Sequence, residues 1–187
     1  DGYVLPEMNV NWHEVPTNHA AAGEDRDHQM LMFNDPGASV VHAAREKRIS
    51  MEARIAKMVD LLAEAPGQHC VLWHHLEDER RAIEAAVPGV RSIFGSQDLE
   101  KNETNAVAFK NGEFPYLATK PEMSGAGSNF QKHCAWEIFA GIDAKFHDFI
   151  QAVHRVVRFG QKHACRIDII YSEAERGTRR ILEEKWP

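Results

Sequence analysis

The sequence contains few cysteines and no C-x-x-C pair. Its 187 residues include three cysteines, which stand far apart, as is typical of a reducing compartment in which disulfides do not form. Each has a histidine beside or near it, in the pairs His69-Cys70, His133-Cys134 and His163 with Cys165, and thiolate and imidazole are zinc ligands. Because each cysteine stands where a predicted strand is about to begin, and small buried cysteines are common core residues, we predict no metal site.

Long apolar runs are also absent. No run approaches the ~20 residues that a membrane-spanning helix needs, and no signal peptide is recognisable. The apolar fraction of 43% and the mixed charge are typical of a soluble globular protein. We therefore expect no membrane partner. The first residue is Asp1 rather than Met, which indicates a fragment of a longer chain.

Several catalytic motifs are missing. There is no G-x-x-x-x-G-K-[ST] loop, whose amides and lysine hold nucleotide phosphates, and no acidic D-E-x-H box for magnesium. Asp78 and Glu79 lie within LEDERR on a predicted helix, where we expect solvated charges. No G-x-S-x-G turn is present, which argues against a serine nucleophile. The chain should therefore not hydrolyse ATP by itself.

The four tryptophans are scattered along the sequence. They predict no base-stacking platform of the kind that single-stranded nucleic acids bind. Trp73 and Trp136 fall in predicted strands, and we expect both in the core. His74 and His75 end the first of these strands, where a structural role is the simpler reading and a contact to DNA or another lobe the alternative.

Charge is distributed unevenly. The formal net charge is −6, whereas a stand-alone nucleic-acid binder usually carries a basic excess. The first part of the chain is acidic, with Asp1, Glu7, Glu14, Glu24, Asp25, Asp27 and Asp35. A local basic strip follows much later, with Arg155, Arg158, Lys162 and Arg166. This distribution fits a domain that supplies one side of a nucleic-acid groove.

Short apolar segments alternate with amphipathic ones along most of the chain. The predicted strands are Val71–His75, Val90–Phe94, Tyr116–Thr119, Ala135–Ala140 and Ile167–Tyr171. The predicted helices are Ser50–Ala65, Glu77–Ala86, Glu100–Lys110, Lys145–Phe159 and Glu173–Lys185. This alternation predicts an α/β fold, with a mostly parallel sheet and helices on both faces. In such sheets ligands bind beyond the carboxyl ends of the strands, where the segment after Thr119 begins.

The chain divides near residue 45. Residues 46–187 hold the alternating elements and form one predicted domain, long enough for a well-buried core. Residues 1–45 form an acidic lead-in, which we expect to connect this domain to another lobe. Within the lead-in, Tyr3–Val15 is predicted to form a strand pair, and the polar stretch Asn18–Asp27 a loop.

The predicted helix Lys145–Phe159 carries two opposed stripes. At 100° per residue one stripe is apolar, with Phe146, Phe149, Ile150, Val153, Val156 and Val157, and the other is polar, with Gln151, His154, Arg155 and Arg158. We expect Gly160 to end the helix, because glycine adopts positive φ readily. The polar stripe is either the ordinary exposed face of a globular helix or a pair of guanidinium groups for a polyphosphate, on whose oxygens charge develops during transfer.

The same segment resembles motif VI of superfamily-two helicases of the SWI/SNF type. The shared pattern Q-A-x-x-R-x-x-R-x-G-Q covers Gln151, Ala152, Arg155, Arg158, Gly160 and Gln161. Upstream, Thr119–Gln131 resembles motif V, a strand followed by a G-x-G-x-N loop at Gly125, Gly127 and Asn129. His69–Glu79 resembles the motif IV region. The three segments follow the order of that family, and their details look most like the helicase-like proteins of phages and prophages.

One departure from the SWI/SNF pattern concerns the motif V loop. The segment between Thr119 and Gly125 is longer than in that family, and Ser124 stands where a glycine is usual. Otherwise the resemblance implies the C-terminal RecA-like lobe of an ATP-dependent DNA helicase or translocase, in the cytoplasm of a bacterial or phage-infected cell. The alternative is a non-catalytic α/β domain that binds nucleotide or a protein partner and retains these motifs as relics.

The resemblance also implies roles for individual residues. Arg155 and Arg158 are expected as arginine fingers and Gln151 as a γ-phosphate sensor. The remaining implied residues are Gly125, Gly127 and Asn129 for nucleotide binding, and Thr119, Ser124 and Ser128 for nucleic acid. The expected ligands are ATP with Mg, held mainly by an upstream N-terminal RecA-like lobe of the same full-length chain, and duplex DNA.

Overall fold

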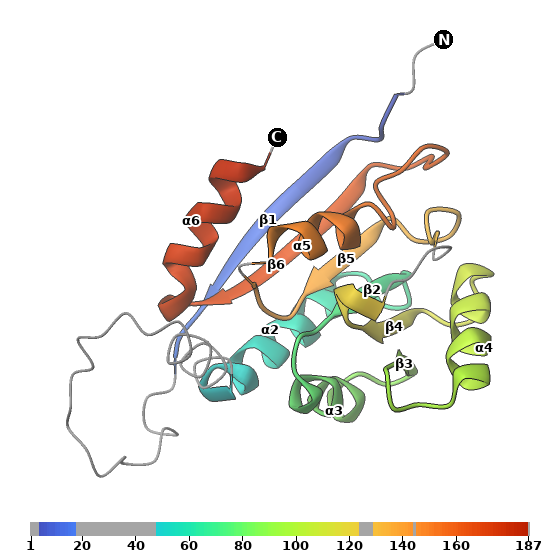
Figure 1. The fold of residues 1–187 in the computed structure, drawn as a ribbon, viewed down its shortest axis with the longest axis horizontal. Coiled ribbons are helices and arrows are strands. Elements are labelled where there is room, and N and C mark those ends of the chain that lie inside the picture. The colour runs from blue at the N-terminus through green and yellow to red at the C-terminus, as the bar shows by residue number, and fades with distance from the viewer. Residues whose placement is uncertain (1–3, 18–47, 124–128, 144, 187) are drawn as a thin grey trace.

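Six parallel strands form one sheet in the computed structural model, which describes residues 4–17, 48–123, 129–143 and 145–186 (Figure 1). The strands are β1 (Met8–Val15), β2 (Cys70–Trp73), β3 (Val90–Ile93), β4 (Tyr116–Thr119), β5 (Trp136–Phe139) and β6 (Cys165–Ser172), in the order β1-β6-β5-β2-β4-β3. The helices are α2 (Met51–Glu64), α3 (Glu77–Ala86), α4 (Leu99–Lys110), α5 (Phe146–Val153) and α6 (Arg176–Lys185). The predicted α/β fold with a parallel sheet is confirmed.

Helices cover both faces of the sheet. One apolar cluster contains side chains of α4, α5 and α6, packed against residues such as Val71 and Ile167. The other contains side chains of α2 and α3, packed against their strand neighbours Leu72 and Ile170. Side chains at successive strand positions point to opposite faces, so a parallel strand covered on both sides must be apolar throughout. Trp73 and Trp136 are fully buried, one in each cluster, as predicted.

The first strand joins the sheet at its edge. β1 pairs in parallel with β6 along its whole length, from the Met8–Cys165 pair to the Val15–Ser172 pair. The sequence predicted a strand pair over Tyr3–Val15, and the structure has a single strand there. The division of the chain near residue 45 stays a prediction, and eight residues of the lead-in belong to the sheet.

A buried carboxylate binds this edge strand to the rest of the sheet. The Asp168 carboxylate on β6 accepts hydrogen bonds from His13 Nε2 at 2.8 Å, Trp136 Nε1 at 2.7 Å and Asn11 Nδ2 at 3.2 Å, and Arg166 Nε lies 2.6 Å away. Burial acts to raise the pKa of Asp168, but these bonds and the Arg166 charge outweigh it and lower the pKa. The carboxylate therefore stays ionised and links β1, β5 and β6 across the sheet.

The helix that carries motif VI is shorter than predicted. The sequence predicted a helix to Phe159, ended by Gly160, but α5 ends at Val153 and the chain continues in turns. Hydrogen bonds from the Arg155 N–H to the Ala152 carbonyl and from the Val156 N–H to the Val153 carbonyl tighten the backbone. Val156 and Val157 are thereby buried in the core. Gly160 has φ +88° and lies in a turn beyond the helix, so the prediction that it ends the helix is wrong.

A buried ion pair joins α2 to α3. Arg54 Nη1 lies 2.6 Å from Glu79 Oε1, and both side chains are fully buried. Arg54 Nε also donates to Ser50 Oγ at 3.0 Å, and Arg54 Nη1 donates to the Ala140 carbonyl. The expectation that Glu79 is a solvated charge is wrong, although its neighbour Asp78 is half-exposed. Burial acts to raise the pKa of Glu79, but the Arg54 charge and the hydrogen bonds from the Leu76 and His75 backbone together outweigh it and lower the pKa to about 2.

Glu79 also closes the loop that follows β2. Its Oε2 accepts the backbone N–H groups of His75 at 2.8 Å and Leu76 at 3.0 Å. On the other side of the pair, a Cβ atom added to Gly141 would lie 2.8 Å from Arg54 Nη1, so a larger residue there would displace the paired guanidinium. The ion pair therefore sets the path of the chain after β2 and after β5.

Removing one partner of this pair should destabilise the fold strongly. Arg54→Met leaves a buried, uncompensated carboxylate, which we expect to cost about 3–5 kcal/mol in the free energy of unfolding. The double variant Arg54→Met/Glu79→Met should recover most of that loss, because no charge remains buried. Urea unfolding measures the stability of the single and the double variant. Arg81→Met is the control, since the Arg81 side chain is 69% exposed. An Arg54→Met midpoint equal to that of the control would contradict the assignment.

Two buried groups should make the fold sensitive to acid in separate pH windows. Burial lowers the pKa of His74 to about 4, whereas an unfolded histidine titrates near 6.5. The unfolded chain therefore binds a proton that the folded chain excludes, and up to about 3 kcal/mol of stability should be lost as pH falls from 6.5 to 4. The contribution of Glu79 is present above pH 4.5 and is lost as pH falls further, toward its pKa of about 2.

Urea unfolding as a function of pH tests this assignment. His74→Gln should flatten the loss of stability between pH 6.5 and 4, since the replaced side chain does not titrate. His147→Gln changes an exposed imidazole and serves as the control. The same slope in the His74→Gln variant and the parent would show that His74 is not the group responsible.

Candidate functional site

The structure brings the segments that resemble motifs V and VI into direct contact. Arg158 Nη1 donates a hydrogen bond to Asn129 Oδ1 at 2.6 Å, and the Phe130 N–H donates to the Arg155 carbonyl at 3.1 Å. We call these four residues the Asn–Arg junction. It lies near the amino ends of β5 and β6, where the loops before these strands meet (Figure 1). Residues 29 positions apart in sequence thus share one site.

Packing against the core supports the junction. Phe130 is buried and meets the Phe109 ring edge-on, with centroids 5.1 Å apart. Val156 and Val157 lie between Arg155 and Arg158 in sequence and are buried in the same cluster. The turn that carries the two arginines is therefore anchored in the core, as a binding site on a rigid scaffold requires.

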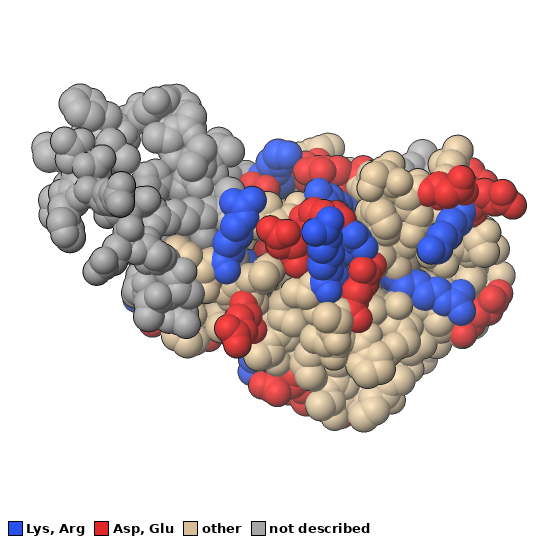
Figure 2. Space-filling view, turned by 90° about the horizontal axis from the view of Figure 1, so that it is seen from below, with Lys and Arg blue, Asp and Glu red and all other residues tan. Residues whose placement is uncertain are grey.

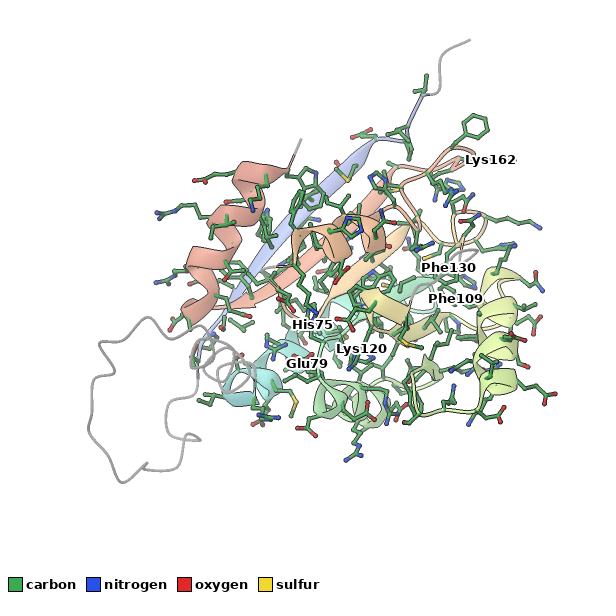
Figure 3. All side chains as sticks on the ribbon, viewed as in Figure 1. His75, Glu79, Phe109, Lys120, Phe130 and Lys162 are labelled. Carbon is green, nitrogen blue, oxygen red and sulfur yellow. The ribbon has the colours of Figure 1, made fainter. Side chains whose placement is uncertain are left out.

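A glutamine completes the turn after Arg158. Gln161 Nε2 donates to the Cys134 carbonyl at 2.9 Å, and Gln161 Oε1 accepts the N–H groups of Lys162 at 3.0 Å and His163 at 3.1 Å. Its amide thus ties the turn to the residues that precede β5. Gln161 was part of the resemblance, but the sequence assigned it no role. Figure 3 shows Phe130 and Lys162 at this end of the molecule.

The two arginines of the junction have different surroundings. Arg158 is exposed, whereas Arg155 is partly buried and its Nε atom is buried without a hydrogen-bond partner among the described residues. Burial lowers the pKa of Arg155, the nearby Arg158 charge lowers it further, and Glu137 acts in the opposite direction. Two like charges so close repel each other, and an anion that contacts both would relieve that repulsion. The geometry therefore favours a phosphate group as the ligand.

The other predicted site residues are placed as follows. Gln151 is exposed on α5. Thr119 ends β4, at the opposite end of the sheet from the junction, and its side chain is buried. Ser124, Gly125, Gly127 and Ser128 lie outside the described residues, so their roles stay predictions.

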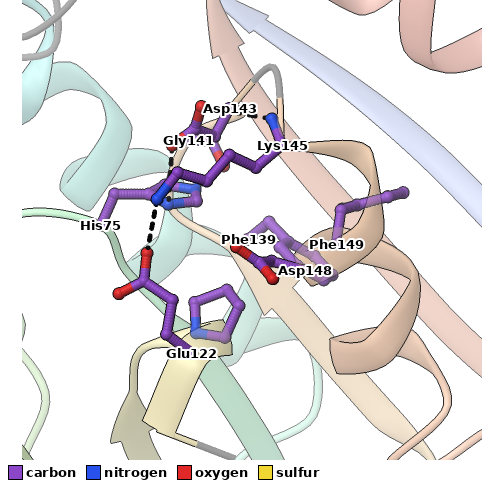
Figure 4. Close-up of a pocket in the computed structure, with 9 residues that line it drawn as sticks. His75, Glu122, Phe139, Gly141, Asp143, Lys145, Asp148 and Phe149 are labelled. Carbon is purple, nitrogen blue, oxygen red and sulfur yellow. Dashed lines mark hydrogen bonds and ion pairs between the residues drawn. The ribbon is translucent and has the colours of Figure 1, made fainter.

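A small pocket lies at the carboxyl ends of the strands, where ligands of parallel sheets usually bind. His75, Glu122, Asp143 and Lys145 line it (Figure 4). Lys145 Nζ lies 3.1 Å from Glu122 Oε1, and His75 Nδ1 lies 3.8 Å from Asp143 Oδ2. The Lys145 ammonium and the Glu122 carboxylate neutralise each other at this pocket. It is a weaker candidate for an anion than the junction, whose arginines lie beside no acid that pairs with them among the described residues.

Histidines and lysines also gather near these carboxyl ends. Figure 3 shows His75, Glu79 and Lys120 close together there. His74 is fully buried, and neither ring nitrogen has a hydrogen-bond partner among the described residues. The burial of His74 therefore supports a structural role for this residue, while a contact of His75 with DNA stays a prediction.

The basic strip is shorter than the sequence predicted. Arg166 was expected to extend it, but its guanidinium lies 2.7 Å from Glu64 and 2.6 Å from the buried Asp168, which compensate its charge. On the face of the molecule that carries α3, positive and negative side chains alternate closely (Figure 2). Arg80, for example, contacts Glu77 and, at 2.6 Å, Glu84. Of the four cations predicted for the strip, Arg155, Arg158 and Lys162 form no such ion pair among the described residues.

The histidine-cysteine neighbours converge in space. His69, His133, Cys134 and His163 line one pocket at the amino ends of the strands. The three thiols are buried, and burial raises the pKa of Cys165 to about 11, so these cysteines are poor sources of thiolate ligands. Within the described ranges, no three metal-ligating side chains are arranged to hold an ion. In the same part of the chain, no helix has the length and apolar character of a membrane span.

Sequence reasoning missed two charged groups that matter to these sites. Arg54 was not singled out, because a single arginine on an amphipathic helix gives no signal of burial. Glu137 was also missed, although a lone acid inside the apolar strand segment AWEIFA was visible in the sequence. An acid at a position that a two-sided parallel sheet must bury is a signal in itself.

Comparisons with known proteins support the fold. No family model and no curated protein matches the chain. Among solved structures, the chain is similar to the C-terminal part of the Fun30 ATPase domain, with a TM-score of 0.61, 15% identity and coverage of 72% of this chain and 46% of that one. It is also similar to the C-terminal domain of the DEAD-box protein Dbp5, with a TM-score of 0.58, 10% identity and coverage of 70% and 77%.

The described chain spans less than half of the Fun30 structure that it resembles. At these identities the likeness concerns the fold alone. The chain therefore has the RecA-like fold found in the C-terminal lobes of helicase-type ATPase domains.

Proposed function

We propose that this chain is the second motor lobe of an ATP-dependent DNA helicase or translocase of the SWI/SNF type, of phage or prophage kind. The observation that carries the proposal is the contact between Arg158 and Asn129. It joins the two segments that resemble motifs V and VI on a fold shared with helicase-type lobes. The fold alone would not suffice, since one fold hosts many functions.

The chemistry of the junction fits phosphoryl transfer. In such reactions charge spreads over several phosphate oxygens, and catalysis depends on positioned cations rather than on a nucleophilic side chain. Arg155 and Arg158 are two cations on a turn that the core holds in place. ATP with Mg is held mainly by the upstream lobe in this proposal, and the arginines neutralise the γ-phosphate from across the interface. Gln151, exposed on α5, senses the same group.

Asn129 takes part in coupling nucleotide binding to nucleic-acid binding. It closes the motif V loop, in which Gly125 and Gly127 are proposed to approach the nucleotide. Thr119, Ser124 and Ser128 of the same segment are proposed to contact the backbone of duplex DNA. Because Arg158 donates to the Asn129 side chain, a shift of Arg158 toward a phosphate changes the hydrogen bonding of this loop.

Arg158→Ala should abolish most of the ATPase activity of a longer protein that includes the upstream lobe. Removal of an arginine finger costs about 10³-fold in turnover in other NTPases, so we expect a loss of two to three decades with ATP still bound. The measurement is DNA-stimulated ATP turnover at matched nucleotide occupancy. Arg180→Ala changes an exposed arginine on α6 and should leave turnover unchanged.

Equal turnover of Arg158→Ala and Arg180→Ala would refute the finger assignment. The alternative would then gain support, namely a non-catalytic α/β domain that binds nucleotide or a partner and retains the motifs as relics. The upstream coding sequence gives an independent discriminator. A phosphate-binding loop and an acidic magnesium box there favour the motor, and their absence favours the relic.

A further inference from the structure

A cavity of about 400 Å³ lies at the amino ends of the strands. Its walls come from three segments, residues 68–69 before β2, 131–135 before β5 and 161–164 before β6. The volume falls within the roughly 300–1,000 Å³ that is usual for small-molecule sites. No acidic side chain is among the described residues that line the cavity, whereas four basic or imidazole side chains do, namely His69, Lys132, His133 and His163.

Two polar atoms in these walls lack a partner. His69 Nε2 and Gln131 Oε1 are buried, and neither forms a hydrogen bond among the described residues. Buried polar atoms are normally satisfied, so each such exception calls for an explanation. An imidazole nitrogen donates or accepts according to its tautomer, and an amide oxygen accepts. A ligand that offers both a donor and an acceptor would satisfy both atoms.

Packing holds the rings of the walls in place. The His69 ring lies 6.0 Å from the Phe109 ring and 6.3 Å from the His133 ring, centroid to centroid. A Cβ atom added to Gly112, which has φ +78°, would lie 3.2 Å from the His133 ring, so the backbone supports that ring closely. Histidine rings held in this way offer flat surfaces on which a planar heterocycle can stack.

Cations adjoin the cavity on the side of the Asn–Arg junction. Gln131 directly follows Phe130 of the junction in sequence, and the Gln161 N–H donates to the Arg158 carbonyl at 3.1 Å. Lys132 lines the cavity, and the Lys162 N–H donates to the Gln161 side chain at 3.0 Å. Positively charged side chains therefore lie where they can bind a phosphate attached to a ligand in the cavity.

We propose that this cavity binds a nucleotide, with its base among His69, Gln131 and His133 and its phosphate beside Lys132 and Lys162. Adenine illustrates the match, because its N6 amino group donates and its N7 accepts, as Gln131 Oε1 and His69 Nε2 require. The nucleotide is either free or an unpaired nucleotide of a nucleic-acid strand, since both present the same base and phosphate. The site goes beyond the proposed motor function and does not depend on it, because the ATP of that function is held mainly by the upstream lobe.

Binding to the 187-residue chain tests this site without any measurement of turnover. One arm is equilibrium dialysis with adenosine 5′-monophosphate, and the other is fluorescence anisotropy with a labelled single-stranded oligodeoxyadenylate. Tighter binding of the monophosphate identifies a free nucleotide as the ligand, and tighter binding of the oligonucleotide identifies a nucleic-acid strand. Ribose 5-phosphate lacks the base and should not compete. No saturable binding in either arm, or competition by ribose 5-phosphate as strong as by the monophosphate, would overturn the proposal.

Two variants of the walls locate the bound base. His69→Phe keeps a ring beside Phe109 but removes both nitrogens, and Gln131→Met keeps most of the volume but removes the acceptor. Each should weaken binding about 5- to 10-fold, because a group of the ligand loses its hydrogen bond. His147→Phe makes the same exchange at an exposed position on α5 and should bind as the parent does. Parental affinity in both wall variants would overturn the placement of the base.

A third variant locates the phosphate and is safe for the fold. Lys132 is exposed, so Lys132→Gln should leave the midpoint of thermal unfolding unchanged. It should weaken the binding of adenosine 5′-monophosphate but not that of adenosine, which has no phosphate. An equal effect on the two ligands would contradict the placement of the phosphate. These binding results are independent of the Arg158→Ala turnover measurement, so a failure of this site and a failure of the motor function can be told apart.

Discussion

The buried Arg54–Glu79 ion pair is the constraint on which much of the remaining structure depends. Two charges removed from water must be paired and hydrogen-bonded on all sides, and here the partners are Ser50, the Ala140 carbonyl and the backbone after β2. The pair therefore sets the relative positions of α2, α3 and the carboxyl ends of β2 and β5. The segment after β5 leads directly into α5, so the pair also sets where the motif VI segment begins.

The arginine site is built by packing at the other end of the same helix. A helix that continued to Gly160 would place Arg155 and Arg158 on one exposed face. Instead α5 ends at Val153, and the turns that follow bury Val156 and Val157. This change of backbone leaves Arg155 partly buried and Arg158 exposed, where it meets Asn129. Both arginines match the motif VI pattern in the sequence, but their surroundings in the structure differ.

The pairing of basic side chains with nearby acids limits where the chain can bind an anion. Arg166 is paired with Glu64 and Asp168, and Lys145 with Glu122. What remains of the basic strip is concentrated around the junction, in a chain of net charge −6. Exposed ion pairs contribute little to stability, but their pairing leaves less of the surface attractive to phosphate.

The layered α/β fold could be predicted from the sequence alone, because apolar strand segments and amphipathic helical segments alternate with a clear period. Tyr116–Thr119 and Glu77–Ala86 have the same bounds in the prediction and in the structure. The motif resemblance singled out Arg155, Arg158 and Asn129, whose roles stay predictions. The sequence did not predict the end of α5, the burial of Glu79 with Arg54, the compensation of Arg166 or the burial of Glu137. Each of these depends on contacts between residues distant in sequence, which local periodicity does not encode.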